Sequence, residues 1–182
     1  MGLDMYLTKK VYVGAEYEHR KVTGVIDIKV GDKPLAINFS NVSYIEERAG
    51  YWRKANAIHK WFVENVQEGT DDCGNYEVST EQLQQLLDVV SKVLEASELV
   101  EGKVINGQTG TAEGWVDNIE DGKVIKDSSV AEELLPCSSG FFFGSTQYDE
   151  YYHGDLVATK EILEAALAGN PGDYEFYYHS SW

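Results

Sequence analysis

Residues 50–66 read GYWRKANAIHKWFVENV and form the densest run of large and polar side chains in the sequence. Buried-type residues recur along this stretch every three or four positions, which is the spacing of one face of an α-helix. The stripe consists of Trp52, Ala55, Asn56, His59, Phe62, Val63 and Val66. We therefore predict one helix over residues 50–66, begun at Gly50 and buried over much of its surface.

Two polar residues of this stripe, Asn56 and His59, lie among apolar neighbours. A buried polar group without a hydrogen-bond partner costs roughly 1–3 kcal/mol, so each side chain must meet a partner. One interpretation is that both are satisfied inside the core, as most buried polar groups are. The other is a pocket in which Trp52 supplies a stacking face, Arg53 contacts an anion, and Asn56 and His59 orient a ligand.

The overall charge restricts the partners. The 182 residues include 31 acidic against 15 basic ones, for a formal net charge of −16. Such a charge disfavours direct binding to nucleic acids and anionic membranes. It is compatible with a basic protein partner, with mimicry of nucleic acid, or with solubility alone. A hydrophobic content of 43% indicates a folded chain, and the length favours one domain over residues 1–182.

The cysteines and the N-terminus favour an intracellular protein. Cys73 and Cys137 lie far apart in no CxxC pair, so zinc and dithiol chemistry have little support, and free thiols suit a reducing compartment. The opening MGLDMYLTKK has no apolar signal segment. No run approaches the roughly 20 apolar residues of a membrane span. We expect no metal and no cofactor, because the acidic stretches 67–78 and 117–128 both fail the spacing of a calcium loop.

The rest of the chain indicates an α+β domain with an antiparallel or mixed sheet and three to four helices packed against it. Residues 4–13 are strand-like, and residues 22–30 and 35–39 alternate as a hairpin that the 50–66 helix covers. Ser79 and Gln82 form a capping box that opens a second helix, which runs to about Ala96.

Shorter elements are expected further along. Residues 101–127 are turn-rich, with short strands at 104–105 and 124–125 and a hairpin turn at Asp121-Gly122. Ser129 and Glu132 cap a helix over residues 130–135. Another helix is expected over residues 147–168. The final aromatic stretch, residues 173–182, is expected to dock in the sheet as a strand, or to pair with a second copy in a homodimer.

A second dense stretch, residues 137–152, reads CSSGFFFGSTQYDEYY. Phe141 to Phe143 is typical of a buried strand. Thr146 and Asp149 then suggest a helix start, and a strand, a turn and a helix can present backbone N–H groups to an anion. There is no Walker loop. The candidate ligand contacts here are Ser145, Thr146, Tyr148 and Asp149.

Four segments carry a resemblance to a family: MGLDMYL at 1–7, GYWRKANAIHKWFV at 50–63, VEGKVING at 100–107 and ELLPCSSGFFFGSTQYDEYY at 133–152. Over essentially its whole length the chain resembles an uncharacterised family from tailed bacteriophages, prophages and their bacterial hosts. The resemblance implies a small accessory protein in the cytoplasm of a bacterial host cell. It supplies no catalytic residue, but the aromatic, Arg, Asn and His pattern of residues 51–61 implies a shared site.

Three functions remain open. The leading hypothesis is a non-enzymatic binding protein that holds a small polar ligand or a protein partner near the candidate residues above. The second is an acidic decoy that mimics nucleic acid. The third is an enzyme with His59 as general base. In that case Asp149 or Asp155 orients the histidine, and the candidate nucleophiles are Ser145, Thr146 and Cys137.

Overall fold

The computed structural model describes residues 2–22, 28–112, 114–140, 143–169 and 171–182, and it confirms the α+β fold. The main sheet contains β1 (Asp4–Tyr12), β4 (Tyr44–Arg53), β5 (Asn75–Val78) and β8 (Glu175–Ser181). Their order is β4-β1-β8-β5, and each neighbouring pair is antiparallel. The strand predicted at residues 4–13 is confirmed. The strand predicted at the chain end is also confirmed, and it pairs on both sides within the sheet.

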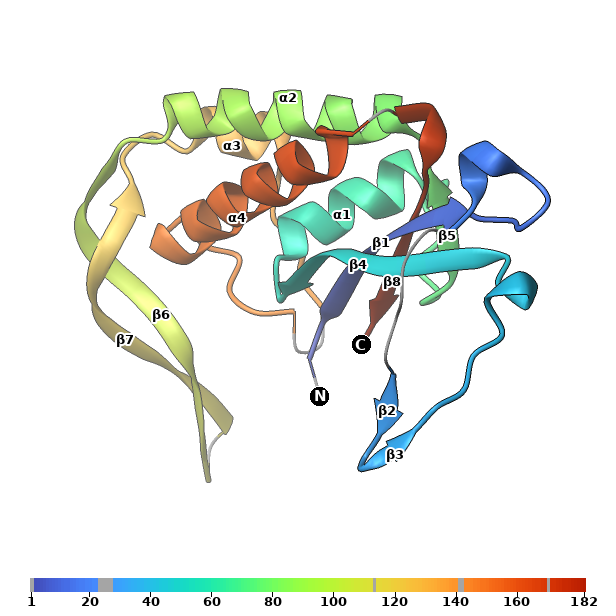
Figure 1. The fold of residues 1–182 in the computed structure, drawn as a ribbon. Helices are drawn as coiled ribbons and strands as arrows, with labels where there is room; N and C mark the ends of the chain where they lie inside the picture. Colours follow the sequence, from blue (N-terminus) through green and yellow to red (C-terminus); the bar gives the residue numbers. More distant parts are fainter. Residues whose placement is uncertain (1, 23–27, 113, 141–142, 170) are drawn as a thin grey trace.

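Helices lie over one face of this sheet (Figure 1). They are α1 (Asn56–Asn65), α2 (Thr80–Ala96) and α4 (Glu150–Leu167), with the short α3 (Ser129–Leu134) against α2. Because side chains alternate across a strand, β1 buries Met5 and Leu7 beneath the helices and leaves Tyr6 and Thr8 on the other face.

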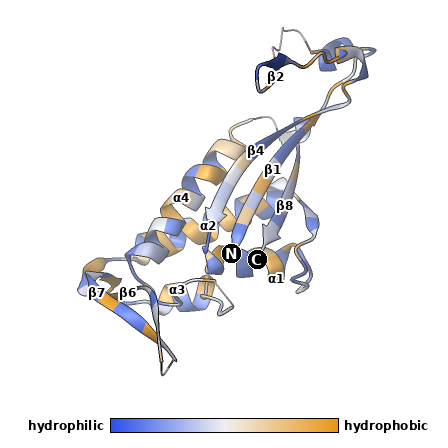
Figure 2. Cartoon of the chain, turned by 90° about the horizontal axis from the view of Figure 1, so that it is seen from below, coloured by the Kyte–Doolittle hydropathy of each residue, from blue (hydrophilic) through white to orange (hydrophobic). Residues whose placement is uncertain are grey.

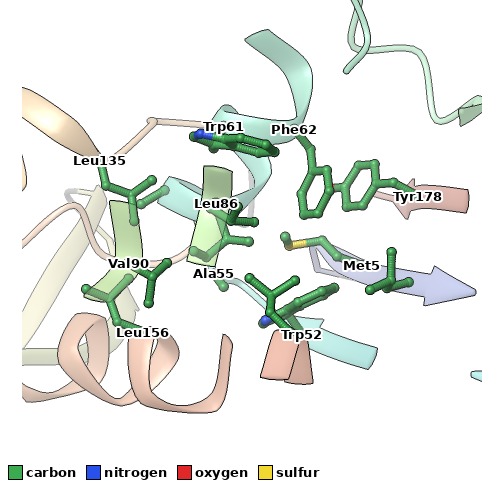
Figure 3. Packing of buried hydrophobic residues seen from close by; sticks show 14 of the residues in the cluster. Met5, Trp52, Ala55, Trp61, Phe62, Leu86, Val90, Leu135, Leu156 and Tyr178 are labelled. Carbon is green, nitrogen blue, oxygen red and sulfur yellow. The ribbon is translucent and has the colours of Figure 1, made fainter. Parts of the chain in front are cut away.

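The core fills the space between the sheet and the helices (Figure 3). The rings of Phe62 and Tyr178 stack with centroids 3.9 Å apart, which joins α1 to β8. Trp52 of β4 donates a hydrogen bond from Nε1 to Oγ1 of Thr159 on α4 at 2.9 Å. These contacts fix the two helices on the sheet, because a buried donor and its acceptor are costly to separate.

Two hairpins project from this body, well apart from each other (Figures 1 and 2). The longer one is formed by β6 (Leu99–Thr111) and β7 (Gly114–Ile125), and most of its outer half is exposed. The shorter one is formed by β2 (Lys29–Val30) and β3 (Lys33–Pro34). Single turns of 3-10 helix occupy Glu18–Arg20, Phe39–Asn41 and Pro171–Asp173.

The predicted helix over residues 50–66 is wrong at its start. Residues 50–53 complete β4, the chain turns at Lys54 with a φ of 62°, and α1 begins only at Asn56. Gly50 therefore does not begin a helix. It allows β4 to approach α4, since a Cβ there would lie 2.5 Å from Cγ2 of Ile162. The helical stripe was misleading because Trp52 and Ala55 reach the same core from different elements.

The hairpin predicted from residues 22–30 and 35–39 also needs correction. Residues 23–27 lie outside the described residues. Within the described part, pairing is confined to residues 29–30 with 33–34, and Leu35 and Ile37 are exposed. The hairpin does not build the sheet under α1. That sheet is formed by strands distant in sequence, which the local alternation could not reveal.

Between residues 101 and 127 the structure has two long strands rather than two short ones. Asp121 and Gly122 do not form the turn: they lie within β7, opposite Lys103 and Gly102. A Cβ on Gly122 would approach Cγ2 of Val104 to 2.7 Å, so this glycine serves close packing. The sequence pattern suggested a turn because a glycine needed for packing resembles one needed for chain reversal.

Smaller boundary corrections follow from the described residues. The last four residues of the predicted acidic loop 67–78 form β5, and α3 begins one residue before the predicted start at 130. Residues 141–142 lie outside the described residues, and Phe143 is buried but belongs to no strand. Helix α4 begins at Glu150 because Asp149 caps it without Thr146, and Gly154 does not divide it.

The capping box predicted at α2 is confirmed: Oγ of Ser79 accepts the N–H of Gln82 at 3.1 Å, and Oε1 of Gln82 accepts the N–H of Ser79 at 2.9 Å. We expect Ser79→Ala to lower the free energy of unfolding by about 1 kcal/mol, because the N–H of Gln82 loses its acceptor. Urea denaturation measures this. Gln85→Ala, on the exposed face of α2, is the control and should change it by less than about 0.5 kcal/mol. Equal effects of both substitutions would contradict the prediction.

Candidate functional site

A cleft of about 1060 Å³ lies between the β6–β7 hairpin and the body of the protein. The hairpin wall includes Ile105, Gln108, Trp115 and Asp117. The opposite side is formed by the end of β4, the first turn of α1 and the loop that precedes α4. Residues from distant parts of the chain therefore converge on one cavity.

Arg53 and Lys54 form a basic rim of this cleft. Arg53 is the last residue of β4, and Lys54 comes directly after it. The N–H of Lys54 donates to the carbonyl of Leu3 at 2.8 Å, which fixes this end of the strand. Gly144 has a φ of 93° and packs closely here, since a Cβ on it would lie 3.3 Å from Cβ of Lys54. Both basic side chains are exposed, and within the described part of the chain neither has an ion-pair partner. The rim is thus free to meet an anionic group.

Asn56, the first residue of α1, fixes the floor of the cleft. Its Nδ2 donates to the carbonyls of Phe143 and Ser145 at 3.2 and 2.8 Å. Its Oδ1 accepts the N–H of Ser138 at 3.0 Å. The buried amide is thereby satisfied inside the protein, as in the first of the two interpretations. Its contribution to the site is to hold the loop in place.

Asp149 lines the cleft beside the first turns of α4, a region that we call its inner end, and is only 1% exposed. Its Oδ1 accepts the N–H groups of Tyr151 and Tyr152 at 2.9 and 3.0 Å and so caps α4. Its Oδ2 is buried without a hydrogen-bond partner among the described residues. Burial raises the pKa of this carboxyl, and the cap hydrogen bonds act against that rise.

Asp155, on the next turns of α4, lines the same end of the cleft and is half-buried. Burial, followed by the charge of Asp149, raises the pKa of Asp155 to about 7. No described residue donates a hydrogen bond to its carboxylate. Nearby, burial raises the pKa of Cys137 to about 12, so this thiol stays protonated at neutral pH and is a poor nucleophile.

His59 does not line the cleft. Its Nε2–H donates to Oδ2 of Asp71 at 3.0 Å, and its Nδ1 accepts the hydroxyl of Tyr178 at 2.7 Å. Trp182 donates to the other oxygen of Asp71 at 3.0 Å. With 1% of its surface exposed and both ring nitrogens engaged, His59 links α1, β8 and the acidic loop. This placement favours a structural role over that of a general base.

The structure brings some of the predicted ligand contacts together and not others. The cleft is lined by Arg53, Asn56, Ser145, Thr146 and Asp149. Trp52, His59 and Tyr148 are not among its lining residues. Strand alternation turns Trp52 into the core, where it is 3% exposed and offers no stacking face. The hydroxyl of Tyr148 accepts the N–H of Cys137, and its ring packs on Tyr152.

The sequence patterns did not indicate the hairpin wall. Trp115 is 73% exposed, and it shares one face of β7 with Asp117, two residues later. The stretch was interpreted as turn-rich because of its glycines. The alternation of Trp115, Asp117 and Ile119 was the available signal for a strand, but the pairing of Ile105 with Ile119 could not be read from it.

Neither comparison with known proteins nor a search for metal-binding side chains assigns a function to this cleft. No family model, curated protein or solved structure matches this chain. Within the described ranges, no three His, Cys, Asp or Glu side chains gather as a metal site. Likewise, none of the helices in these ranges has the length and apolar character needed to cross a membrane.

Asp155 should make stability depend on pH. Its pKa is about 7 in the folded protein against 3.8 ordinarily. Between these values the folded state binds more protons than the unfolded state, so stability falls as pH rises. We expect Asp155→Asn, which removes this term, to be more stable relative to wild type at pH 8 than at pH 5, by about 1–3 kcal/mol. Urea denaturation at both pH values measures the difference. A difference that does not change with pH would contradict the placement of Asp155.

Proposed function

We propose that this chain is a non-enzymatic binding protein that holds a segment of a partner polypeptide in the cleft between the β6–β7 hairpin and the body. The observation that carries this proposal is Trp115, a 73% exposed indole on the wall of a cleft of about 1060 Å³. Trp is enriched among the residues that contribute most to protein–protein binding, where a partner covers the ring. A phage-type accessory protein acting on a host pathway fits this role.

The shape of the cleft supports a polypeptide rather than a small molecule. Pockets for small ligands measure about 300–1,000 Å³ and enclose most of the ligand. Here the volume lies just above that range, and one wall is an exposed hairpin. An extended segment that runs along the cleft covers the hairpin wall and still continues into solvent at both ends.

The edge of β7 offers backbone groups for such a segment. At its base β7 forms an antiparallel bridge between Val124 and Asp149, and the N–H of Ile125 donates to the carbonyl of Tyr148 at 2.9 Å. Further out, β7 pairs only with β6 among the described strands. A free strand edge binds an extended peptide by main-chain hydrogen bonds. The bridge at the base shows where an added strand would continue the pairing.

The other hypotheses stay predictions. A small polar ligand would have to bridge the basic rim and the acidic inner end of the same cleft. The acidic-decoy hypothesis rests on the net charge of −16. The enzyme hypothesis rests on His59, whose partners and burial favour a structural role.

Selection from a displayed random-peptide library against the immobilised protein tests the proposal. We expect enriched peptides whose affinity falls by about tenfold or more in Trp115→Ala, because the exposed indole is lost. Val116→Ala is the matched control: it is exposed on the opposite face of the same strand and should change affinity by less than about twofold.

Two results would contradict the proposal. One is that no peptide is enriched while native mass spectrometry shows a retained small molecule, which favours the small polar ligand. The other is a set of enriched peptides that bind the Trp115→Ala and Val116→Ala variants equally well, which places the binding surface elsewhere.

A further inference from the structure

We propose that the inner end of the cleft, formed by Asp149 and Asp155, is a subsite for an organic cation, namely the ammonium or guanidinium group of a basic side chain. This inference rests on the proposed binding function and specifies the chemistry of the partner segment. The net charge of −16 gives such a segment long-range attraction to the protein.

The first support is an unpaired buried acceptor. Oδ1 of Asp149 is occupied by the two N–H groups of the α4 cap, but Oδ2 is buried without a partner among the described residues. A buried polar atom left unpaired costs roughly 1–3 kcal/mol, more for a charged group. A donor brought by a ligand into this end of the cleft would remove that cost.

The second support is the carboxylate of Asp155. It lines the cleft, is half-buried, and accepts no hydrogen bond from the described residues. After burial, the charge of Asp149, another acid, also raises its pKa. On α4, the neighbouring Glu150 is also acidic and accepts the N–H of Lys123. Both acids line the same cleft, and no ion pair of the described residues places a cation on either of them.

No ion pair of the described residues joins a basic side chain, His153 and Lys123 included, to Asp149 or Asp155. On the α1 side, the charge of Lys60 lowers the pKa of Cys137, and its ammonium group forms an ion pair with Glu64 at 3.7 Å. From the preceding loop, Cys137 lines the cleft and is affected by the charges of Asp149 and Asp155, and burial raises its pKa. On the hairpin wall, Asp117 is acidic and accepts a hydrogen bond from Gln108 at 2.7 Å. Arg53 and Lys54 form the rim at the end of β4.

The surroundings favour an organic cation over a metal ion. Calcium takes six to eight oxygen ligands, whereas two carboxyl groups meet here and no cluster of three metal-ligating acids, His or Cys is found in the described ranges. Tyr151 and Tyr152 line the same end of the cleft. Aromatic rings beside carboxylates suit an ammonium or guanidinium group, since the ring face attracts cations.

The bound cation should favour ionised Asp155. A carboxyl whose pKa is about 7 is largely protonated below neutrality and ionised above it. A cation that binds the ionised form must lower this pKa, because binding and deprotonation are linked. Binding should therefore strengthen as pH rises through 7.

The test follows the side-chain carboxyl ¹³C resonances of the aspartates by NMR across a pH titration, with n-butylammonium chloride as the probe. We expect the pKa of Asp155 to fall by about half a unit or more with a saturable dependence on the amine. Equal concentrations of n-butanol, sodium chloride and calcium chloride should not produce this shift. An Asp155 titration that the amine leaves unchanged, or that calcium shifts as strongly, would overturn the proposal.

Variants locate the effect. Asp155→Asn should abolish saturable binding of the amine. In this variant, binding is measured from the carboxyl resonance of Asp149. Asp88→Asn, a substitution on α2 outside the cleft at a carboxylate that already has a donor, should leave binding intact. Saturable binding that persists in Asp155→Asn would place the amine elsewhere and overturn the subsite.

The two proposals can fail separately. Enriched library peptides that lack a Lys or Arg requirement, together with no amine effect on Asp155, would remove the cation subsite and leave the peptide cleft. An amine effect on Asp155 without any enriched peptide would support the subsite and remove the polypeptide function. Enriched peptides whose affinity falls about tenfold when one Lys is replaced by norleucine would support both.

Discussion

The side chain of Asn56 connects two parts of the chain that are far apart in the sequence. It begins α1, and its three hydrogen bonds hold Ser138, Phe143 and Ser145 of the loop that leads to α4. The basic rim lies immediately before it, and the acidic inner end of the cleft lies just after that loop. The separation of these two regions therefore depends on one buried amide. An apolar residue of the same size would leave two carbonyls and an N–H group unpaired.

The body on which this amide acts is held by dense packing. The Phe62–Tyr178 stack and the Trp52–Thr159 hydrogen bond fix α1 and α4 on the sheet. The relay from Trp182 through Asp71 and His59 to Tyr178 ties the chain end into the same core. One side of the cleft is thus built on elements that cannot shift without losing buried contacts. For the proposed binding function, such support would keep this side of the cleft in its bound geometry before a partner arrives.

Some patterns of adjacent residues predicted the structure and others did not, since the turn expected at Asp121-Gly122 lies within β7. The capping box at Ser79, the strand at residues 4–13 and the terminal strand all follow from local spacing. The change from strand to helix at Lys54 could not be predicted from this spacing. Apolar residues three or four positions apart fit one helix, but they also fit a strand and a helix that pack against the same core. Five of the predicted contact residues do line the cleft: Arg53, Asn56, Ser145, Thr146 and Asp149. They could be predicted because polar residues at helix starts and in loops are recognisable in a sequence. Trp115 was missed because the turn was expected at Asp121-Gly122, whereas the chain reverses where Thr111 pairs with Gly114.

The β6–β7 hairpin has an irregular register between Ile105 and Gln108, beside the cleft. Such a bulge bends the ribbon and interrupts its regular ladder. On the near side of this point, the N–H of Ile105 is held by Oε1 of Gln147 at 2.9 Å. On the far side, Trp115 and the outer strands are exposed and have no core of their own. The width of the cleft therefore depends on how far this two-stranded ribbon bends, because no side-chain packing among the described residues holds the outer half of the hairpin in place. In the proposed peptide complex, bending of this ribbon would adjust the cleft to the thickness of the bound segment while the core beneath it stays unchanged.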